Sequence, residues 1–411
     1  MMLLPCCPYF QSASPTLDRL TAADSLLKTK TESYEMAGPL AGVKVVEMNA
    51  IGPAPFAAMI LADMGAEVIR VDRHVAGFLS ADGSLLGRGR RSIAIDPRKP
   101  GATEVLLKLI DSADILIEGF RPGVMERLGL GPDICLERNR KLIYGRMTGW
   151  GQSGPLAHAA GHDLNYIALS GVLNAMGHAD RPPTPPLHLV GDMGGGAMFL
   201  VAGILGALFE GQKSGLGQVV DAAICDGTTL LGSMYYDLRH QGQWNDQRQN
   251  NMLDGAAPFY GCYTCADGKF VSIGAIEPPF YQLLLQLCEI DDPDFKQQWQ
   301  QKAWPVLRKK LEALFLTRPR DVWTRLLEGT DACFAPVLDF SEAPTHPHNQ
   351  ARGLFTETDG VLHPAPAPRL SRTPVEAGGL VKNGENTLEI LEQLGLNVAQ
   401  IDELRSTGAI V

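Results

Sequence analysis

The sequence predicts an α/β protein with a large domain, built on a parallel sheet with helices on its faces, and a smaller α+β domain. Three observations support this. Short apolar runs of strand length alternate with helical stretches between residues 42 and 147, which is typical of a parallel sheet. An almost uncharged run of helical length, 197–209, follows later. Beyond it, Asp267-Gly268 separates two alternating runs, which predicts an antiparallel hairpin.

The elements of the large domain can be placed in order from Gly42. Pro53 begins the first helical stretch, where its missing N–H would be unpaired anyway, and Gly65 is a plausible C-terminal cap. Further helices are expected at 102–112 and 123–128. Strands are expected at 43–48, 67–72, 92–96, 114–118, 142–147 and within 215–226. The large domain is therefore expected to be Rossmann-like.

A dinucleotide site is nevertheless not predicted. The first strand-to-helix turn, 49–55, lacks the G-x-G-x-x-G spacing that brings backbone amides onto a pyrophosphate. Asp72 ends the second strand where a ribose-binding acid would stand. Without the glycines, that match is weak.

The chain is expected to have four parts. Residues 1–35 lack a periodic apolar pattern and are interpreted as a disordered extension, or as sequence before a true start at Met36. The large domain then covers 36–229 and the small α+β domain 230–365. The segment 366–411 begins in a proline-rich linker. It is expected to return to the large domain with two short helices, 387–394 and 399–404.

Composition restricts the partners. The chain has 411 residues, 45% hydrophobic and 20% charged, with a net charge of −10, as in an ordinary soluble globular protein. The acidic balance argues against nucleic acid, because phosphate binding needs a basic face. The run 197–209 is too short to span a membrane. Of the scattered cysteines only Cys262 and Cys265 lie close together, which predicts free thiols, no metal site and a cytoplasmic location.

A histidine and a carboxylate in glycine-flanked turns could form an acid/base pair. His162 stands in Gly161-His162-Asp163, and Asp192 stands before three glycines and the apolar run. Taken alone, His162 would more often be structural, and Asp192 would most simply cap the following helix. The pair therefore needs further support.

That support comes from a resemblance carried by motifs spread from Met36 onward: 36–40, 65–73, 118–131, 148–154, 161–165, 191–196, 251–255 (NMLDG) and 274–278 (GAIEP). As an ordered set they resemble the α-methylacyl-CoA racemases of the type III (CaiB/BaiF-like) CoA-transferase family. The resemblance implies an isomerase that interconverts (R)- and (S)-2-methylacyl-CoA thioesters through an enolate. It also implies two interlocked subunits in a homodimer, and no cofactor, because CoA is part of the substrate.

The resemblance assigns roles to three residues. His162 and Asp192 match the two proton carriers on opposite faces of the α-carbon. Glu277 matches a carboxylate that hydrogen-bonds the catalytic histidine, expected from the partner subunit. Taken alone, Glu277 precedes a proline and could be an exposed turn residue. Asp163, beside His162, is expected to make a backbone or ligand hydrogen bond.

The resemblance also implies where CoA binds. Arg73 follows the second strand, where a cation can pair with a phosphate, and Arg127 matches a second phosphate contact. A surface salt bridge is the alternative for each arginine. The other expected substrate contacts are Ala94, Ile95, Asp96, Pro97, Ala160, Gly161, Asp163, Leu164 and Asn165. Met193 replaces an aromatic residue of the racemases, so the acyl preference stays open.

Two alternatives remain. In a type III CoA-transferase, the aspartate matching Asp192 would attack the thioester as a nucleophile. Those enzymes carry a glycine-rich loop in the small domain, where this chain has Gly274-Ala275-Ile276-Glu277. A CoA-ester-binding protein without chemistry is the other alternative, and the intact His162, Asp192 and Glu277 argue against it.

Overall fold

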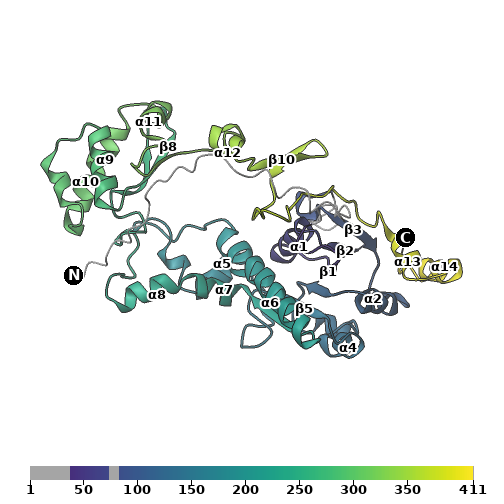
Figure 1. The fold of residues 1–411 in the computed structure, drawn as a ribbon. Helices are drawn as coiled ribbons and strands as arrows, with labels where there is room; N and C mark the ends of the chain where they lie inside the picture. The colour runs from purple at the N-terminus through teal and green to yellow at the C-terminus, as the bar shows by residue number, and fades with distance from the viewer. Residues whose placement is uncertain (1–37, 74–82, 411) are drawn as a thin grey trace, which may run out of the picture.

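A computed structural model describes residues 38–73 and 83–410, so the expected extension at 1–35 lies outside it. The large domain contains a six-stranded parallel sheet in the order β3-β2-β1-β4-β5-β6 (Figure 1). The strands are β1 (Lys44–Met48), β2 (Glu67–Asp72), β3 (Arg90–Ala94), β4 (Ile115–Glu118), β5 (Ile143–Thr148) and β6 (Val219–Ala223). The strand order reverses between β1 and β4, which makes this junction the switch point of a doubly wound sheet. The predicted Rossmann-like α/β fold is confirmed.

Two apolar cores cover the two faces of the sheet. The first core joins the sheet to α2, α3, α4 and the C-terminal helices. The second joins it to α1 and to α6. The helices here are α1 (Pro53–Asp63), α2 (Ala102–Asp111), α3 (Val124–Arg127), α4 (Pro132–Arg138), α6 (Met198–Ser214), α13 (Thr387–Gln393) and α14 (Val398–Ser406).

Two strand positions differ from the prediction. β3 begins at Arg90, two residues earlier than predicted. The charge of Arg90 is neutralised by a buried ion pair with Glu47 at 3.0 Å, and an apolar pattern cannot reveal such a pair. β6 ends at Ala223, and α7 (Ile224–Leu231) starts immediately. The apolar pattern runs unbroken across that junction, so the sequence placed both in one segment.

The glycine-rich segment is part of a helix rather than a turn before one. Leu189–Ala197 forms a π-helical segment that continues into α6, so Asp192 lies inside it and is not its cap. Its glycines allow close packing: a Cβ on Gly195 would stand 2.3 Å from Thr228 Oγ1 on α7. The joined helix, Leu189–Ser214, has 26 residues and contains an 18-residue stretch with a mean hydropathy of 1.6. It is thus longer than the predicted run. Its length and composition would allow it to cross a membrane, but core helices of soluble proteins can have the same length and composition.

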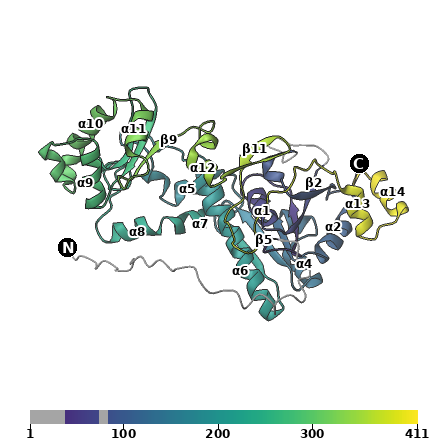
Figure 2. The ribbon, with the colours of Figure 1, turned by 45° about the horizontal axis from the view of Figure 1, so that its top comes forward.

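The second domain stands apart from the parallel sheet, with α8 (Ser233–His240) between the two (Figures 1 and 2). Its antiparallel sheet, β7-β8-β9, contains the predicted hairpin. The elements are β7 (Tyr260–Thr264), β8 (Phe270–Gly274), β9 (Phe334–Val337), α9 (Pro278–Leu287), α10 (Trp304–Phe315) and α11 (Arg320–Leu327). A separate apolar core holds them together.

The chain then returns to the large domain. After α12 (Pro347–Ala351), the hairpin of β10 (Phe355–Thr358) and β11 (Val361–Pro364) places His363 Nδ1 2.9 Å from a buried guanidinium nitrogen of Arg88. Farther on, Asn386 and Ser92 exchange two hydrogen bonds of 3.0 Å. Helices α13 and α14 then pack on the sheet side that carries α2 (Figure 2).

Candidate active site

A cavity of about 560 Å³ lies at the switch point of the sheet. The turn after β1 supplies Ile51, Gly52 and Pro53, and the turn after β4 supplies 119–122. The lining is completed by residues 147–150, 157, 159–162 and 224, by Asn165 and Tyr166 of α5 (Asp163–Leu169), and by Asp192 of the π-helical segment. Ligands of doubly wound sheets bind at this place, outside the carboxyl ends of the strands.

His162 and Asp192 both line this cavity. His162 immediately precedes α5, and its backbone N–H donates to Asn165 Oδ1 at 3.0 Å. Asp192 comes from the π-helical segment, 30 positions later in the chain. Its carboxylate packs on Gly52, where an added Cβ would lie 3.0 Å from Asp192 Oδ2. Gly52 also has a φ of 76°, so a side chain there would be strained as well as crowded.

The surroundings of Asp192 raise the pKa of its carboxyl above the ordinary value of an aspartate. Burial, and next the negative charge of Asp163, raise the pKa of Asp192 to about 6, although His188 and His162 act in the opposite direction. At pH 7 the carboxyl is then mainly ionised, with a protonated fraction on the order of a tenth. Such a group can both accept and donate a proton near neutral pH.

The expected substrate contacts near His162 divide into two groups. Ala160, Gly161 and Asn165 line the cavity. Asp163 and Leu164 are not among its lining residues. The carboxylate of Asp163 instead turns to the π-helical segment and accepts a hydrogen bond from Asp192 N at 2.7 Å. Leu164 is exposed on α5.

A smaller hollow of about 100 Å³ lies at the ends of β1, β2 and β3, and contains Arg73, Ile95 and Pro97. Phe120 lines both this hollow and the larger cavity, so the two are neighbours. Asp72 also lines the smaller hollow. Its side chain is held in place, because it is fully buried and accepts hydrogen bonds from Arg70, Asn49 and Ser92.

The remaining residues expected to contact CoA lie near the hollow but do not line it. Ala94 N donates to Thr387 Oγ1 at 3.0 Å. A hydrogen-bonded ion pair with Arg98 lowers the pKa of Asp96 to about 2. Arg127 is exposed at the end of α3.

Glu277 lies in the second domain, where it immediately precedes α9. It is absent from the described lining of the switch-point cavity. Burial, and then the charge of Glu277, raise the pKa of the Cys333 thiol, which places Glu277 beside β9. Within one chain, therefore, Glu277 does not join His162 and Asp192.

Three further residues line the cavity that the sequence analysis did not single out. Arg121 brings a cation, and its position in the turn after β4, three residues beyond Glu118, was the signal that could have found it. Trp150 and Tyr166 meet edge to face, with ring centroids 4.8 Å apart. The Tyr166 hydroxyl donates to Gly161 O, so these rings support the backbone next to His162. No periodic pattern predicts such a contact.

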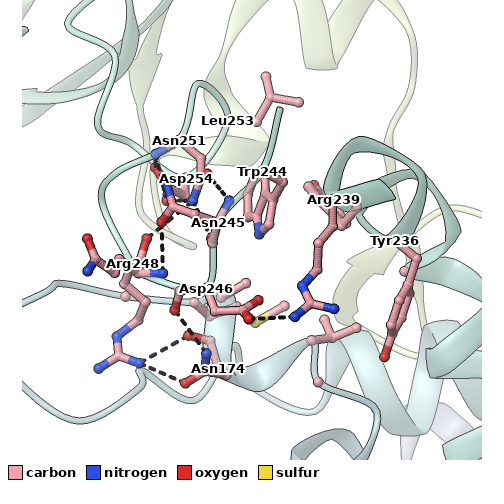
Figure 3. A pocket seen from close by; sticks show the side chains of 18 residues that line it. Asn174, Tyr236, Arg239, Trp244, Asn245, Asp246, Arg248, Asn251, Leu253 and Asp254 are labelled. Atoms are coloured by element: carbon pink, nitrogen blue, oxygen red, sulfur yellow. Dashed lines mark hydrogen bonds and ion pairs between the residues drawn. The ribbon is translucent and has the colours of Figure 1, made fainter. Parts of the chain in front are cut away.

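A separate cavity of about 610 Å³ lies where α8 joins the second domain (Figure 3). Two of its arginines have partners within the cavity: Arg239 forms an ion pair with Asp246 at 3.1 Å, and Arg248 donates to the backbone carbonyl Asn174 O at 3.1 Å. The motif 251–255 contributes Asn251, Leu253 and Asp254. Although larger, this cavity contains neither His162 nor Asp192.

Across 38–73 and 83–410, no three His, Cys, Asp or Glu side chains are grouped so as to hold a metal ion.

Comparisons with known proteins place the chain in a family. The sequence pattern of CoA-transferase family III matches residues 40–379. The chain is 44% identical to the α-methylacyl-CoA racemase of Mus musculus over 371 residues, which cover 89% of this chain and 96% of that protein. It is 43% identical to the Homo sapiens α-methylacyl-CoA racemase, covering 90% and 97%.

The fold has a solved counterpart as well. A crystal structure of a CaiB/BaiF family protein from Brucella suis superposes with a TM-score of 0.74 at 26% identity, covering 87% of this chain and all of that one. The chain belongs to CoA-transferase family III.

Proposed function

We propose that the chain is a racemase that interconverts (R)- and (S)-2-methylacyl-CoA thioesters. The observation that carries the proposal is the shared cavity of His162 and Asp192 at the switch point of the sheet. A base and an acid at one cavity are what a 1,1-proton transfer needs. The similarity to the mouse and human racemases supports the same reaction.

The proposed chemistry moves one proton out and one in. The carboxylate of Asp192 or the neutral imidazole of His162 removes the α-proton, and the electron pair of the C–H bond delocalises onto the thioester oxygen as an enolate. The other group, protonated, then delivers its proton to the opposite face of the carbon. The pair thus begins and ends with one proton: the carrier that removed the α-proton now holds it, and the carrier that gave its own proton to the carbon is left unprotonated. CoA is part of the substrate, and no cofactor takes part.

We further propose that the thioester substrate bridges the two neighbouring hollows. The nucleotide part of CoA would lie near Arg73, Ile95 and Pro97, with Arg127 as a second cation, and the chain would pass Phe120 to reach His162. Cations near a strand end suit the phosphates of CoA. The six free cysteines among the described residues support a reducing compartment, and we propose the cytoplasm.

A homodimer follows from the proposed role of Glu277. Large apolar side chains are exposed on the elements that line the cavity: Ile51 at 64%, Leu189 at 57% and Met198 at 48%. Exposed apolar surface of this kind marks interfaces. We propose that the second domain of a partner copy covers this surface and brings its Glu277 to His162, where a carboxylate would fix the histidine tautomer.

Mixed dimers test this arrangement. We expect H162A and E277A homodimers each to have strongly reduced racemisation, whereas a purified H162A/E277A hybrid has one complete site and recovers activity. The measurement is racemisation by differently tagged, co-expressed subunits. A hybrid no more active than the two parents, or an active monomer in sedimentation, would overturn the proposed dimer.

The proton count of the pair predicts the pH dependence. Because the working enzyme carries one proton on His162 and Asp192 together, kcat/KM should fall at low pH, where both are protonated, and at high pH, where neither is. The plot of kcat/KM against pH should therefore be bell-shaped, and with the pKa of Asp192 raised to about 6, its active range should include near-neutral pH. Both enantiomers should give the same profile, since each reacts with a form of equal proton count. A profile that lacks the fall on either the acid or the alkaline side would contradict the mechanism.

The function itself is tested against CoA transfer. The chain is incubated with one enantiomer of a 2-methylacyl-CoA ester and a second, free carboxylic acid. We expect the other enantiomer to form with no ester of the second acid. Transfer of CoA to that acid without racemisation would establish the transferase, with Asp192 as nucleophile.

A further inference from the structure

Asp163 follows one proposed proton carrier, His162, in the chain and is hydrogen-bonded to the other, Asp192. It follows His162 in the chain as the first residue of α5. Its Oδ1 accepts a hydrogen bond from Asp192 N at 2.7 Å. One peptide and one hydrogen bond therefore connect the backbone of His162 to the backbone of Asp192. Only 9% of Asp163 is exposed, and it does not line the cavity.

The donor in this bond, the backbone N–H of Asp192, is not expected to find an acceptor within its own helix. At the start of the segment, a π-type backbone hydrogen bond runs from Met193 N to His188 O, at 3.2 Å. Asp192 N precedes it, among the N–H groups that a helix start leaves unpaired. An aspartate commonly caps such a group from the residue before the helix. Here Asp163 caps it from a different segment.

The fit of this contact depends on a glycine. A Cβ on Gly191 would stand 2.2 Å from Asp163 Oδ1 and 2.8 Å from Ile167 Cγ2. Gly191 is buried and has no positive φ that would itself require glycine. Close approach of the Asp163 carboxylate thus explains why this position has no side chain.

We infer that Asp163 is a positioning residue whose carboxylate ties the backbone of Asp192 to the start of α5 and so fixes the separation of the two proton carriers. The inference rests on the proposed function for its catalytic meaning, although the tie itself is a feature of the fold. Asp163 touches neither proton in the reaction; it acts through Asp192.

The same carboxylate has an electrostatic effect, because its charge is the second cause, after burial, of the raised pKa of Asp192. The other charged groups facing Asp192 are His162 and His188. The remaining titratable groups of the cavity are Arg121 and Tyr166. The elements packed on the π-helical segment add Asp63 on α1, Tyr144 and Arg146 on β5, Glu210 and Lys213 on α6, Asp221 on β6, and Cys225 and Asp226 on α7. Removing the charge of Asp163 should therefore move the pKa of Asp192 down.

Three variants separate the tie from the charge. Asp163→Asn keeps an oxygen that can accept from Asp192 N but removes the charge. Asp163→Ala removes both. Gly191→Ala keeps the charge and forces the carboxylate away. Asp133→Asn, an exposed aspartate in the first turn of α4, is the matched control.

We expect D163A and G191A each to lower kcat by roughly 10²-fold, because a displacement of about 1 Å in a catalytic group can have that effect. KM should change little, since Asp163 does not line the cavity. D163N should retain most of kcat and shift the pH bell of kcat/KM to lower pH. G191A should leave the negative charge near Asp192 and lack the acid shift of D163N. D133N should match the unmodified chain in every respect.

A second readout needs no turnover. Carboxyl ¹³C NMR of aspartate-labelled protein, with D192N to assign the signal, gives the titration of Asp192 directly. We expect a lower pKa in D163N than in the unmodified chain. A D163A variant that folds with unchanged kcat, or an effect confined to KM, would overturn the inference, and an Asp192 signal unmoved in D163N would overturn the electrostatic effect of Asp163. Failure of the unmodified chain to racemise would instead refute the proposed function. The Asp192 titration in D163A compared with that in D163N would still decide the tie, because these two variants differ in the hydrogen bond and not in the charge.

Discussion

Replacing His162 with alanine or Asp192 with asparagine should lower racemisation by roughly 10²–10⁴-fold, the usual contribution of one general acid or base. Each variant keeps one carrier, so each should still exchange the α-proton of mainly one enantiomer with solvent. The two variants should favour opposite enantiomers, because the carriers serve opposite faces. The measurement is deuterium uptake and inversion, followed separately from each enantiomer.

A control is available close by in the chain. His158 is exposed and, unlike its neighbours Ala157 and Ala159, does not line the cavity, so H158A should leave both rates unchanged. Binding of a CoA ester near Arg73 should persist in all three variants, since neither carrier lies in that hollow. Near-normal racemisation by D192N would be incompatible with the two-carrier mechanism.

Gly149→Ala should be the next most damaging change. An added Cβ would stand 2.0 Å from Tyr166 Cζ and 2.1 Å from Cε1, so the aromatic ring must leave its place. The ring would then lose its contact with Trp150 and the bond from its hydroxyl to Gly161 O, which support the backbone entering His162. We expect a fall in kcat of roughly 10²-fold and a stability loss of about 1–3 kcal/mol from overpacking. Steady-state kinetics and denaturant unfolding measure the two effects.

Two comparisons isolate the cause. Gly379→Ala places its methyl only near Asp359 Oδ2, at 3.9 Å, so it should alter neither kcat nor stability appreciably. Tyr166→Phe keeps the ring and removes only the hydroxyl, so its loss should be smaller than that of G149A. If G149A were as active as the unmodified chain, Tyr166 would have no positioning role.

The sequence predicted the parallel sheet because its strands are short and apolar and alternate with helices. It predicted less well where charge is hidden in the interior. Arg90 belongs to β3 only because Glu47 neutralises it within the sheet, and no one-dimensional pattern contains that partner. The length of the apolar helix was underestimated because the glycines at 194–196 suggest a turn. In the fold, contacts with α7 keep these glycines helical.

The sequence proposed the two proton carriers of the candidate site but not the contacts that connect them. His162 and Asp192 were identified through motifs, and the fold brings both to one cavity. The bond from Asp192 N to Asp163 joins residues 29 positions apart, and the packing of Tyr166 on Gly149 also depends on tertiary structure. Arg121 lies in the turn after β4, so the rule that ligands bind beyond the carboxyl ends of strands could have found it.

The measurement that tests the two-carrier mechanism most directly follows the α-hydrogen in deuterated water. A single enantiomer of a 2-methylacyl-CoA ester is converted to a small extent, and both enantiomers are recovered and analysed for deuterium. With separate carriers on the two faces, the newly formed enantiomer carries solvent deuterium while the remaining starting enantiomer is still largely protiated. Product that retains the original hydrogen would contradict the mechanism, and so would an acyl anhydride trapped on Asp192.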